Sequence, residues 1–208
     1  TAQNATIYND NQQSNAFKSL RAQLLPASAG GDSTIWGVTK TAYPFTQAIA
    51  VSGSDITSSN ILQKIFDAYV TIRKKAKGMP FNVVMSYKNF GAVLKVLEVQ
   101  KGSFNVKPGS QKTNQFGWTE VEIGGFAGAL KLIAVQECDD DVIYFLDLKS
   151  MKLYSNGGLQ RRKSPDGISF FEVRATTGFT YIVDHALYGE FVVHSPCSNG
   201  ILYSISYS

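Results

Sequence analysis

The chain has 208 residues, a formal net charge of +4 and 44% apolar residues, which is the composition of a globular protein. It is long enough to bury a core without disulfides or metal ions, and it has neither a signal-peptide pattern nor the ~20-residue apolar run of a membrane helix. Charged residues make up only 17%, which suits a protein whose surface contacts neighbours, although a charge-poor monomer fits as well.

The segment 1–34 is predicted to form an extended N-terminal arm. Its start is rich in Asn and Gln, and a short helical pattern follows from Phe17 to Leu25. Pro26 and the turn-forming residues 28–33 break this pattern, so we expect the arm to be poorly ordered without a partner. Residues 34–45 follow as short extended pieces.

The most regular helical pattern covers residues 55–77. Apolar residues recur there at steps of three and four, which places them on one face of a helix. Ser54 or Asp55 can cap the start of this helix, and the cations within residues 73–77 complement the helix dipole at its end. Pro80 then prevents the helix from continuing.

A strand and a second helix are predicted next. Residues 81–85 are predicted to form a short buried strand, and Ser86 can cap a helix that ends at Gly102. The loop that follows, residues 103–117, is long for a compact domain, which indicates that it has a function.

The rest of the chain is predicted to be mostly strand. Strands are expected at residues 118–123, 130–135, 142–146, 151–154, 168–175, 179–185, 191–193 and 201–203. Two helices near the front and a strand-rich remainder indicate an α+β fold and not an alternating βαβ fold.

The charged and catalytic residue types do not assemble into a catalytic, cofactor or metal site. Asp139, Asp140 and Asp141 are consecutive carboxylates that cannot all face one cation on an extended chain, so a solvated turn is favoured. His185 and His194 are the only histidines, and neither lies in a pattern that supplies a nucleophile and an orienting acid. We therefore predict that the chain is not an enzyme.

Three further features are explained without a catalytic or binding role. Cys138 and Cys197 lie far apart in the sequence, which favours two free thiols without a role over a disulfide or a metal site. The glycine-rich run 124–128 lies between two strands and lacks phosphate-loop spacing, so a hairpin or bulge is predicted. The basic clusters 73–77 and 161–163 are predicted to be solvated, although either could meet DNA or an acidic neighbour.

The ordered set of these segments resembles the major capsid proteins of tailed phages of the Hong Kong 97 type. The resemblance covers roughly residues 30–195. The segments that carry it are residues 31–38, 41–43, 52–55, 83–90, 118–123, 142–148, 173–174 and 188–193.

The resemblance implies a capsid fold with two subdomains behind the arm. A peripheral subdomain, with the long spine helix and the long antiparallel strands, would comprise residues 35–86 and 151–187. An axial subdomain, with a mixed sheet and helices, would comprise residues 87–150 and 188–208. The loop at 103–117 would then point toward the axis of the capsomer.

The implied function is self-assembly into hexamers and pentamers of an icosahedral phage head that encloses double-stranded DNA. The chain would be assembled in the bacterial host cytoplasm and reside in the virion. Its implied partners are other copies of itself, a scaffolding segment or protein upstream of Thr1, the portal, a maturation protease and non-specifically bound DNA, but no membrane. Val173 and Thr180 occupy the positions where some members carry the Asn and Glu of a cross-link, so cross-linking is not expected.

Three alternatives to the phage capsid protein stay open. The first is the shell protein of an encapsulin-like nanocompartment, which shares the fold and encloses enzymes instead of DNA. The second is a monomeric α+β module that binds a carbohydrate or peptide in an aromatic groove. The third is a hydrolase that uses His185 or His194.

Overall fold

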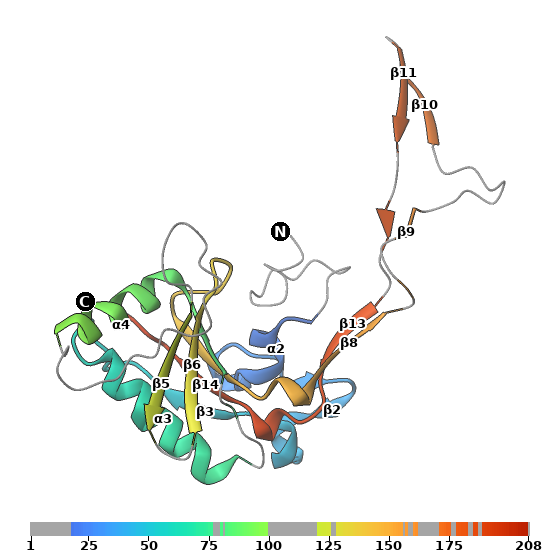
Figure 1. The fold of residues 1–208 in the computed structure, drawn as a ribbon. Coiled ribbons are helices and arrows are strands. Elements are labelled where there is room, and N and C mark those ends of the chain that lie inside the picture. The colour runs from blue at the N-terminus through green and yellow to red at the C-terminus, as the bar shows by residue number, and fades with distance from the viewer. Residues whose placement is uncertain are drawn as a thin grey trace.

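In the computed structural model, a body of sheet and helices carries a long two-stranded ribbon that projects from one side (Figure 1). The structure describes residues 18–76, 80, 82–99, 120–125, 128–155, 157, 160–161, 171–175, 178–182, 185–186 and 189–207. The predicted loop at 103–117 lies outside these residues.

The body is built on a mixed sheet of six strands. Their order is β3 (Ile49–Ser52), β14 (Gly200–Tyr203), β7 (Val142–Leu146), β4 (Asn82–Met85), β6 (Gly128–Ala134) and β5 (Glu120–Gly125). The β3–β14 and β4–β6 pairs are parallel, and the other pairs are antiparallel. All five side chains of β7 are buried, because this strand has elements packed on both of its faces. The strand β3 was missed by the sequence analysis.

Two helices cover one face of the sheet, as Figure 1 shows. They are α3 (Ile61–Lys75) and α4 (Tyr87–Val99). The predicted apolar stripe of α3 is confirmed, since Ile61, Ile65 and Ile72 are fully buried in the larger of two core clusters. The predicted cap of α4 is also confirmed, because the backbone N–H of Asn89 donates to Ser86 Oγ at 3.3 Å.

The predicted start of the long helix is wrong by six residues. Residues 55 and 58–60 lie in turns, and the helix begins at Ile61. Asp55 does not cap the helix but forms an ion pair with Lys64. The side chain of Asn60 accepts a hydrogen bond from the backbone N–H of Thr57 at 2.7 Å, so local side-chain bonds compete successfully with an earlier helical turn.

The interpretation of residues 1–34 as a loosely ordered arm is wrong for residues 18–34. The helix α2 (Leu20–Leu24) lies on the sheet face opposite α3, in the second core cluster. Leu20, Leu24 and Leu25 are 1–2% exposed there. The spacing of four places Leu20 and Leu24 on one face of the helix, and Leu25 follows at its C-cap. Residues 1–17 lie outside the described residues.

Short elements join α2 to the sheet. They are the 3₁₀ helix η1 (Ala27–Ala29), the hairpin of β1 (Thr34–Ile35) and β2 (Val38–Thr39), and the 3₁₀ helices η2 (Lys40–Ala42) and η3 (Pro44–Thr46). The extended conformation predicted for residues 41–45 is therefore wrong, since Pro44 opens a 3₁₀ turn.

The ribbon consists of successive antiparallel pairs. They are β8 (Met151–Ser155) with β13 (Gly189–Val193), β9 (Gln160–Arg161) with β12 (His185–Ala186), and the hairpin of β10 (Phe171–Ala175) with β11 (Gly178–Ile182). The 3₁₀ helices η4 (Leu148–Ser150) and η5 (Pro196–Ser198) join its two strands to the body. The strands expected at 168–175 and 179–185 are confirmed over the residues that the structure describes, as β10 and β11. The expected residues 168–170 and 183–184 lie outside the described residues.

The division into peripheral and axial subdomains stays a prediction. What the structure shows is that α3 and α4, from either side of the predicted boundary at residues 86 and 87, contribute to the same core cluster.

A buried lysine closes the end of α2. The Lys40 side chain is 3% exposed, and its Nζ donates to the carbonyl oxygens of Ala22 at 2.8 Å and Leu25 at 2.9 Å. These carbonyls have no partner within the helix at its C-terminal end. Burial lowers the pKa of Lys40 to about 8, because the charged form is poorly solvated.

This lysine is expected to make stability rise with pH. Between about pH 8 and the ordinary lysine pKa of about 10.4, the unfolded chain holds a proton that the folded chain releases, so the free energy of unfolding increases. We expect Lys40 to raise the free energy of unfolding by about 1 kcal/mol between about pH 8 and about pH 9. The measurement is urea unfolding at both pH values, and the contribution of Lys40 is the rise in the unaltered chain less the rise in the Lys40→Met variant. Lys74 is exposed, so the Lys74→Met variant should show the same dependence of the free energy of unfolding on pH as the unaltered chain. The same dependence in the Lys40→Met variant would contradict the prediction.

Candidate assembly surface

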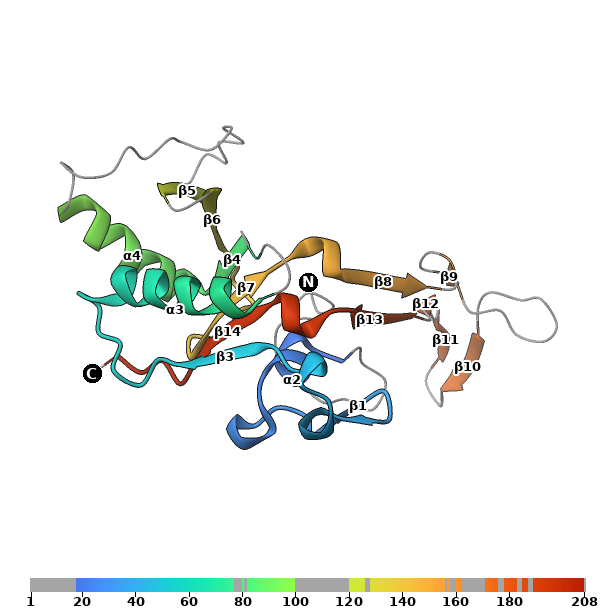
Figure 2. The same ribbon diagram turned by 90° about the horizontal axis from the view of Figure 1, so that it is seen from below.

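The ribbon exposes strands that the body does not cover. In β8 only Met151 is partly buried, and the four following side chains are exposed. Leu153 and Tyr154 are 54% and 48% exposed. Figure 2 shows the ribbon extending well beyond the sheet and its helices. An isolated two-stranded ribbon is only marginally stable in water, so this surface is suited to contact with another molecule.

A buried asparagine fixes the root of the ribbon to the sheet. The Asn199 side chain is fully buried. Its Oδ1 accepts from the backbone N–H of Asp147 at 2.8 Å, and its Nδ2 donates to Ser150 Oγ at 2.8 Å and to the Ser195 carbonyl at 2.9 Å. Its own carbonyl accepts from the N–H of Ile49 in β3 at 3.1 Å. One side chain thus joins both connections between ribbon and body.

Replacing this asparagine is expected to loosen the root. Asn199→Ala removes three side-chain hydrogen bonds from a buried site and should lower the free energy of unfolding by about 2–4 kcal/mol. Asn82→Ala is the matched control, since Asn82 makes one side-chain bond of 3.4 Å to the Leu146 carbonyl and should cost less than about 1 kcal/mol. Equal losses in the two variants, measured by urea unfolding, would refute a special role for Asn199.

The α2 segment holds the other side of the root. Gln23 is 1% exposed. Its Nε2 donates to the carbonyls of Lys18 and Phe191, both at 2.9 Å, and its Oε1 accepts from the N–H of Val193 at 3.0 Å. The side chain of Gln23 therefore makes the backbone hydrogen bonds with β13 that a neighbouring strand would otherwise make. The N–H of Lys18 also donates to Glu190 at 2.8 Å.

An exposed pair links the two ribbon strands near the root. Tyr154 Oη and His194 Nε2 are 2.7 Å apart, with the rings in an edge-on arrangement. His194 therefore has a structural partner in Tyr154. His185 lies in β12, at the register position of Arg161, so the two histidines are on different ribbon segments.

The acidic triplet forms the predicted turn but is not simply solvated. The Arg21 guanidinium binds Asp141 through both of its terminal nitrogens, at 2.8 and 2.9 Å, and Asp139 at 3.2 Å. Burial raises the pKa of Asp139 in spite of the nearby Arg21. The interaction ties the turn to α2, and the sequence separation of about 120 residues hid it from sequence reasoning.

The remaining predicted features have structural roles. Burial raises the pKa of the Cys138 thiol, which keeps it protonated and unreactive. Cys197 lies 3.4 Å from the Ser195 hydroxyl. The glycine run 124–128 belongs to the β5–β6 hairpin, where Gly125 pairs with Gly128, so that prediction is confirmed.

The basic clusters and the cross-link positions lie apart in the fold. Residues 73–75 end α3 in the body, whereas Arg161 lies in the ribbon and residues 162–163 lie outside the described residues. Val173 and Thr180 pair with each other in the β10–β11 hairpin. Whether the chain cross-links stays a prediction.

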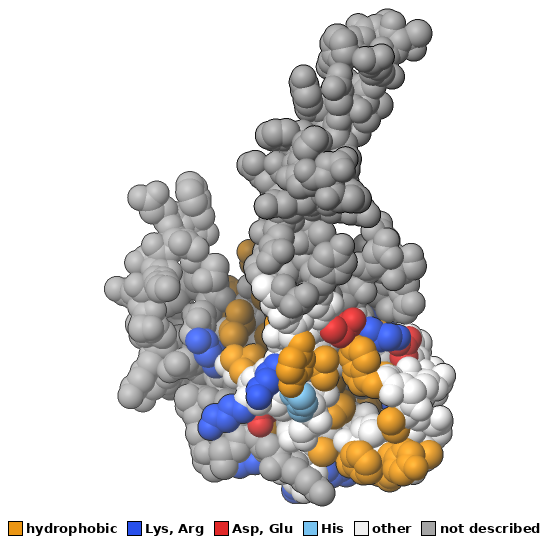
Figure 3. Space-filling model, turned by 90° about the vertical axis from the view of Figure 1, so that its right-hand side faces the viewer, with side chains coloured by type: hydrophobic (Ala, Val, Ile, Leu, Met, Phe, Trp, Pro, Cys, Tyr) orange, Lys and Arg blue, Asp and Glu red, His pale blue; other side chains and the backbone are white. Residues whose placement is uncertain are grey.

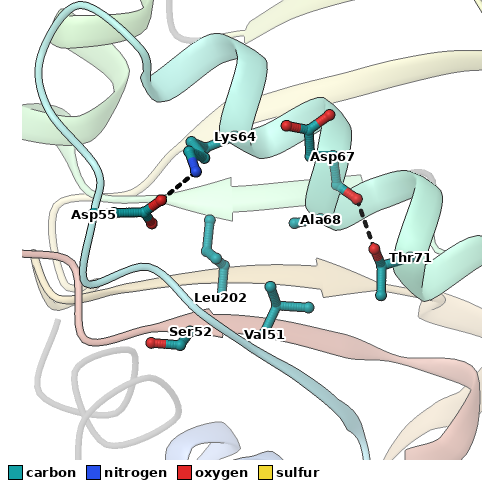
Figure 4. Close-up of a pocket in the computed structure, with 8 residues that line it drawn as sticks. All are labelled: Val51, Ser52, Asp55, Lys64, Asp67, Ala68, Thr71 and Leu202. Carbon is teal, nitrogen blue, oxygen red and sulfur yellow. Dashed lines mark hydrogen bonds and ion pairs between the residues drawn. The ribbon is translucent and has the colours of Figure 1, made fainter.

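A shallow cavity lies between β3 and α3. It has a volume of about 210 Å³ and is lined by Val51, Ser52, Asp55, Lys64, Asp67, Ala68, Thr71 and Leu202 (Figure 4). The ion pair with Lys64 lowers the pKa of Asp55. Among the described residues, no group of three or more potential ligands could hold a metal ion. Within that same part of the chain, no helix is long and apolar enough to span a membrane.

Comparison with known proteins identifies the fold through solved structures. No protein-family model and no curated protein matches the chain. The capsid asymmetric unit of cyanophage A-1(L) matches with a TM-score of 0.59 and 13% identity, over 97% of this chain and 64% of that one. A virus-like particle from Pyrococcus furiosus matches with a TM-score of 0.41 and 11% identity, over 74% of this chain and 56% of that one.

The chain therefore shares the α+β fold of the cyanophage capsid protein. The predicted fold class and the predicted resemblance are confirmed at the level of the fold. The chain spans 64% of the length of the cyanophage protein that it matches.

Proposed function

We propose that the chain is a shell protein that self-assembles into a capsid. The observation that carries this proposal is the alignment of 97% of the chain with a cyanophage capsid protein. The exposed ribbon supports it, because strands without a covering layer need a neighbour. A structural role also agrees with a surface on which Asp55, His194 and the Asp139–Asp141 turn are engaged in structural contacts.

The finer proposal is the major capsid protein of a tailed phage, with double-stranded DNA inside the head. Hexamers and pentamers of the chain would form an icosahedral shell in the bacterial host cytoplasm. A scaffolding segment or protein, a portal and a maturation protease would act with it. DNA would be contacted without reading its sequence, through cations and phosphates.

The ribbon supplies a mechanism for assembly. A ribbon that leaves the body of one copy can lie on the body of the next, which makes a head-to-tail contact that closes into rings. Each contact can be weak on its own, because every copy in a ring is held from two sides. The Asn199 and Gln23 networks would fix the direction in which the ribbon leaves the body.

Light scattering and negative-stain imaging of the purified chain, over a range of salt and protein concentrations, test this proposal. Rings or closed shells are the expected result. A strict monomer under every condition would contradict self-assembly and favour the monomeric binding module. Nuclease-protected DNA in particles isolated from cells would support the phage head, whereas DNA-free particles with enclosed protein would favour a nanocompartment.

A further inference from the structure

The β1–β2 hairpin carries a backbone strain that another sequence would avoid. Its two-residue loop is Trp36-Gly37, with φ of 54° at Trp36 and 79° at Gly37, between the paired residues Ile35 and Val38. Such loops favour Asn or Gly at both positions, because bulky side chains rarely adopt positive φ. Strained residues of this kind cluster at functional sites.

The strained residue presents a large apolar side chain to solvent, and two more follow. Trp36 is 49% exposed, Tyr43 50% and Phe45 60%, and the ring centroids of Tyr43 and Phe45 are 5.7 Å apart. We call these three residues the aromatic patch. Figure 3 shows hydrophobic side chains gathered on the side of the body from which the ribbon rises.

The aromatic patch lies in a stretch that presents no charge at the surface. Between Asp32 and Asp55 the only charged residue is Lys40, and its ammonium is buried against the carbonyls of Ala22 and Leu25. Binding to nucleic acid or to anionic lipid needs exposed cations. The surface that matches this stretch is therefore another uncharged, partly apolar protein surface.

We propose that the aromatic patch docks onto a second copy of this chain, with Trp36 as its anchor. The inference rests on the proposed function, because in a shell the partner present at the highest concentration is another copy. Each copy is also poor in charge, since only 17% of its residues are charged. Trp and Tyr are the residues that most often anchor interfaces, and the strained turn serves to present Trp36.

Trp36→Asn separates an interaction role from a structural one. The variant creates the Asn-Gly sequence that this turn favours, so the Tm of dilute protein should stay unchanged or rise by about 2–4 °C. Self-association, measured by sedimentation velocity over a range of concentrations, should weaken at least about tenfold. Phe45→Ser should weaken association similarly, without the gain in Tm. Tyr87→Asn is the control, because Tyr87 is 54% exposed but lies on α4, and it should associate like the unaltered chain.

Three results would overturn the proposal. The first is association of the unaltered strength in W36N and F45S. The second is an equal weakening in Y87N, which would make exposed aromatic residues interchangeable. The third is a lower Tm in W36N together with normal association in F45S, which would give Trp36 a structural role. If the unaltered chain fails to associate at all, the proposed function fails too; if it assembles and the patch variants assemble equally, only this inference fails.

Discussion

Replacing residues 156–188 with the two-residue turn Asn-Gly is expected to abolish shell assembly and leave the body folded. Ser155 and Gly189 are paired residues of β8 and β13, so a two-residue turn can join them without changing the register. The described members of both core clusters lie outside the deleted residues. The deletion removes β9–β12, the part of the ribbon farthest from the body (Figure 2).

Two measurements decide this prediction. Thermal unfolding should show that the shortened chain keeps a cooperative transition within a few degrees of the unaltered chain. Light scattering at concentrations where the unaltered chain forms shells should show no shells. Shells of normal size and yield from the shortened chain would refute a role for the ribbon in assembly.

Gly31→Ala is expected to lower the free energy of unfolding by about 3 kcal/mol. A Cβ at residue 31 would lie 2.0 Å from the Leu25 carbonyl oxygen and 2.6 Å from its carbon. That carbonyl cannot move freely, because it accepts a hydrogen bond from the Lys40 ammonium and belongs to a residue that is 1% exposed. Relief of the clash would displace the end of α2 from the second core cluster.

Gly91→Ala is the matched control for this substitution. Gly91 lies within α4, and a Cβ there would meet no atom within 4 Å. Alanine should stabilise this helix by about 0.5–1 kcal/mol relative to glycine. Opposite signs for the two variants in urea unfolding are the expected result. A Gly31→Ala variant as stable as the unaltered chain would show that the turn after α2 adapts at little cost.

The sequence predicted the elements whose causes are local. The three- and four-residue spacing of α3, the Ser86 cap of α4 and the continuous apolar run of β7 each reflect interactions within a few residues. The start of α3 was missed, because side-chain bonds of Asn60 and Asp55 hold residues 55–60 outside the helix. The strand β3 was missed, since its pairing with β14 joins residues about 150 positions apart.

The residues that position the ribbon could not be predicted. Gln23 and Asn199 act through hydrogen bonds to backbone groups up to 170 residues away. A single Gln or Asn in a sequence forms no pattern from which such bonds could be predicted. The aromatic patch left a local signal, which is a Trp directly before a Gly between two short β-branched segments. The positive φ of Trp36 is visible only in the structure.

The position of β14 has a consequence for the order in which the protein folds during synthesis. This strand lies between β3 and β7, so the sheet is split in two until residues 200–203 leave the ribosome. Leu202 and Ile205 also complete the larger core cluster. A nascent chain would therefore lack a closed core for most of its translation, and a chain that stops before Gly200 would present no folded body to its neighbours. Only a copy that has been translated through β14 can therefore fold and assemble with other copies.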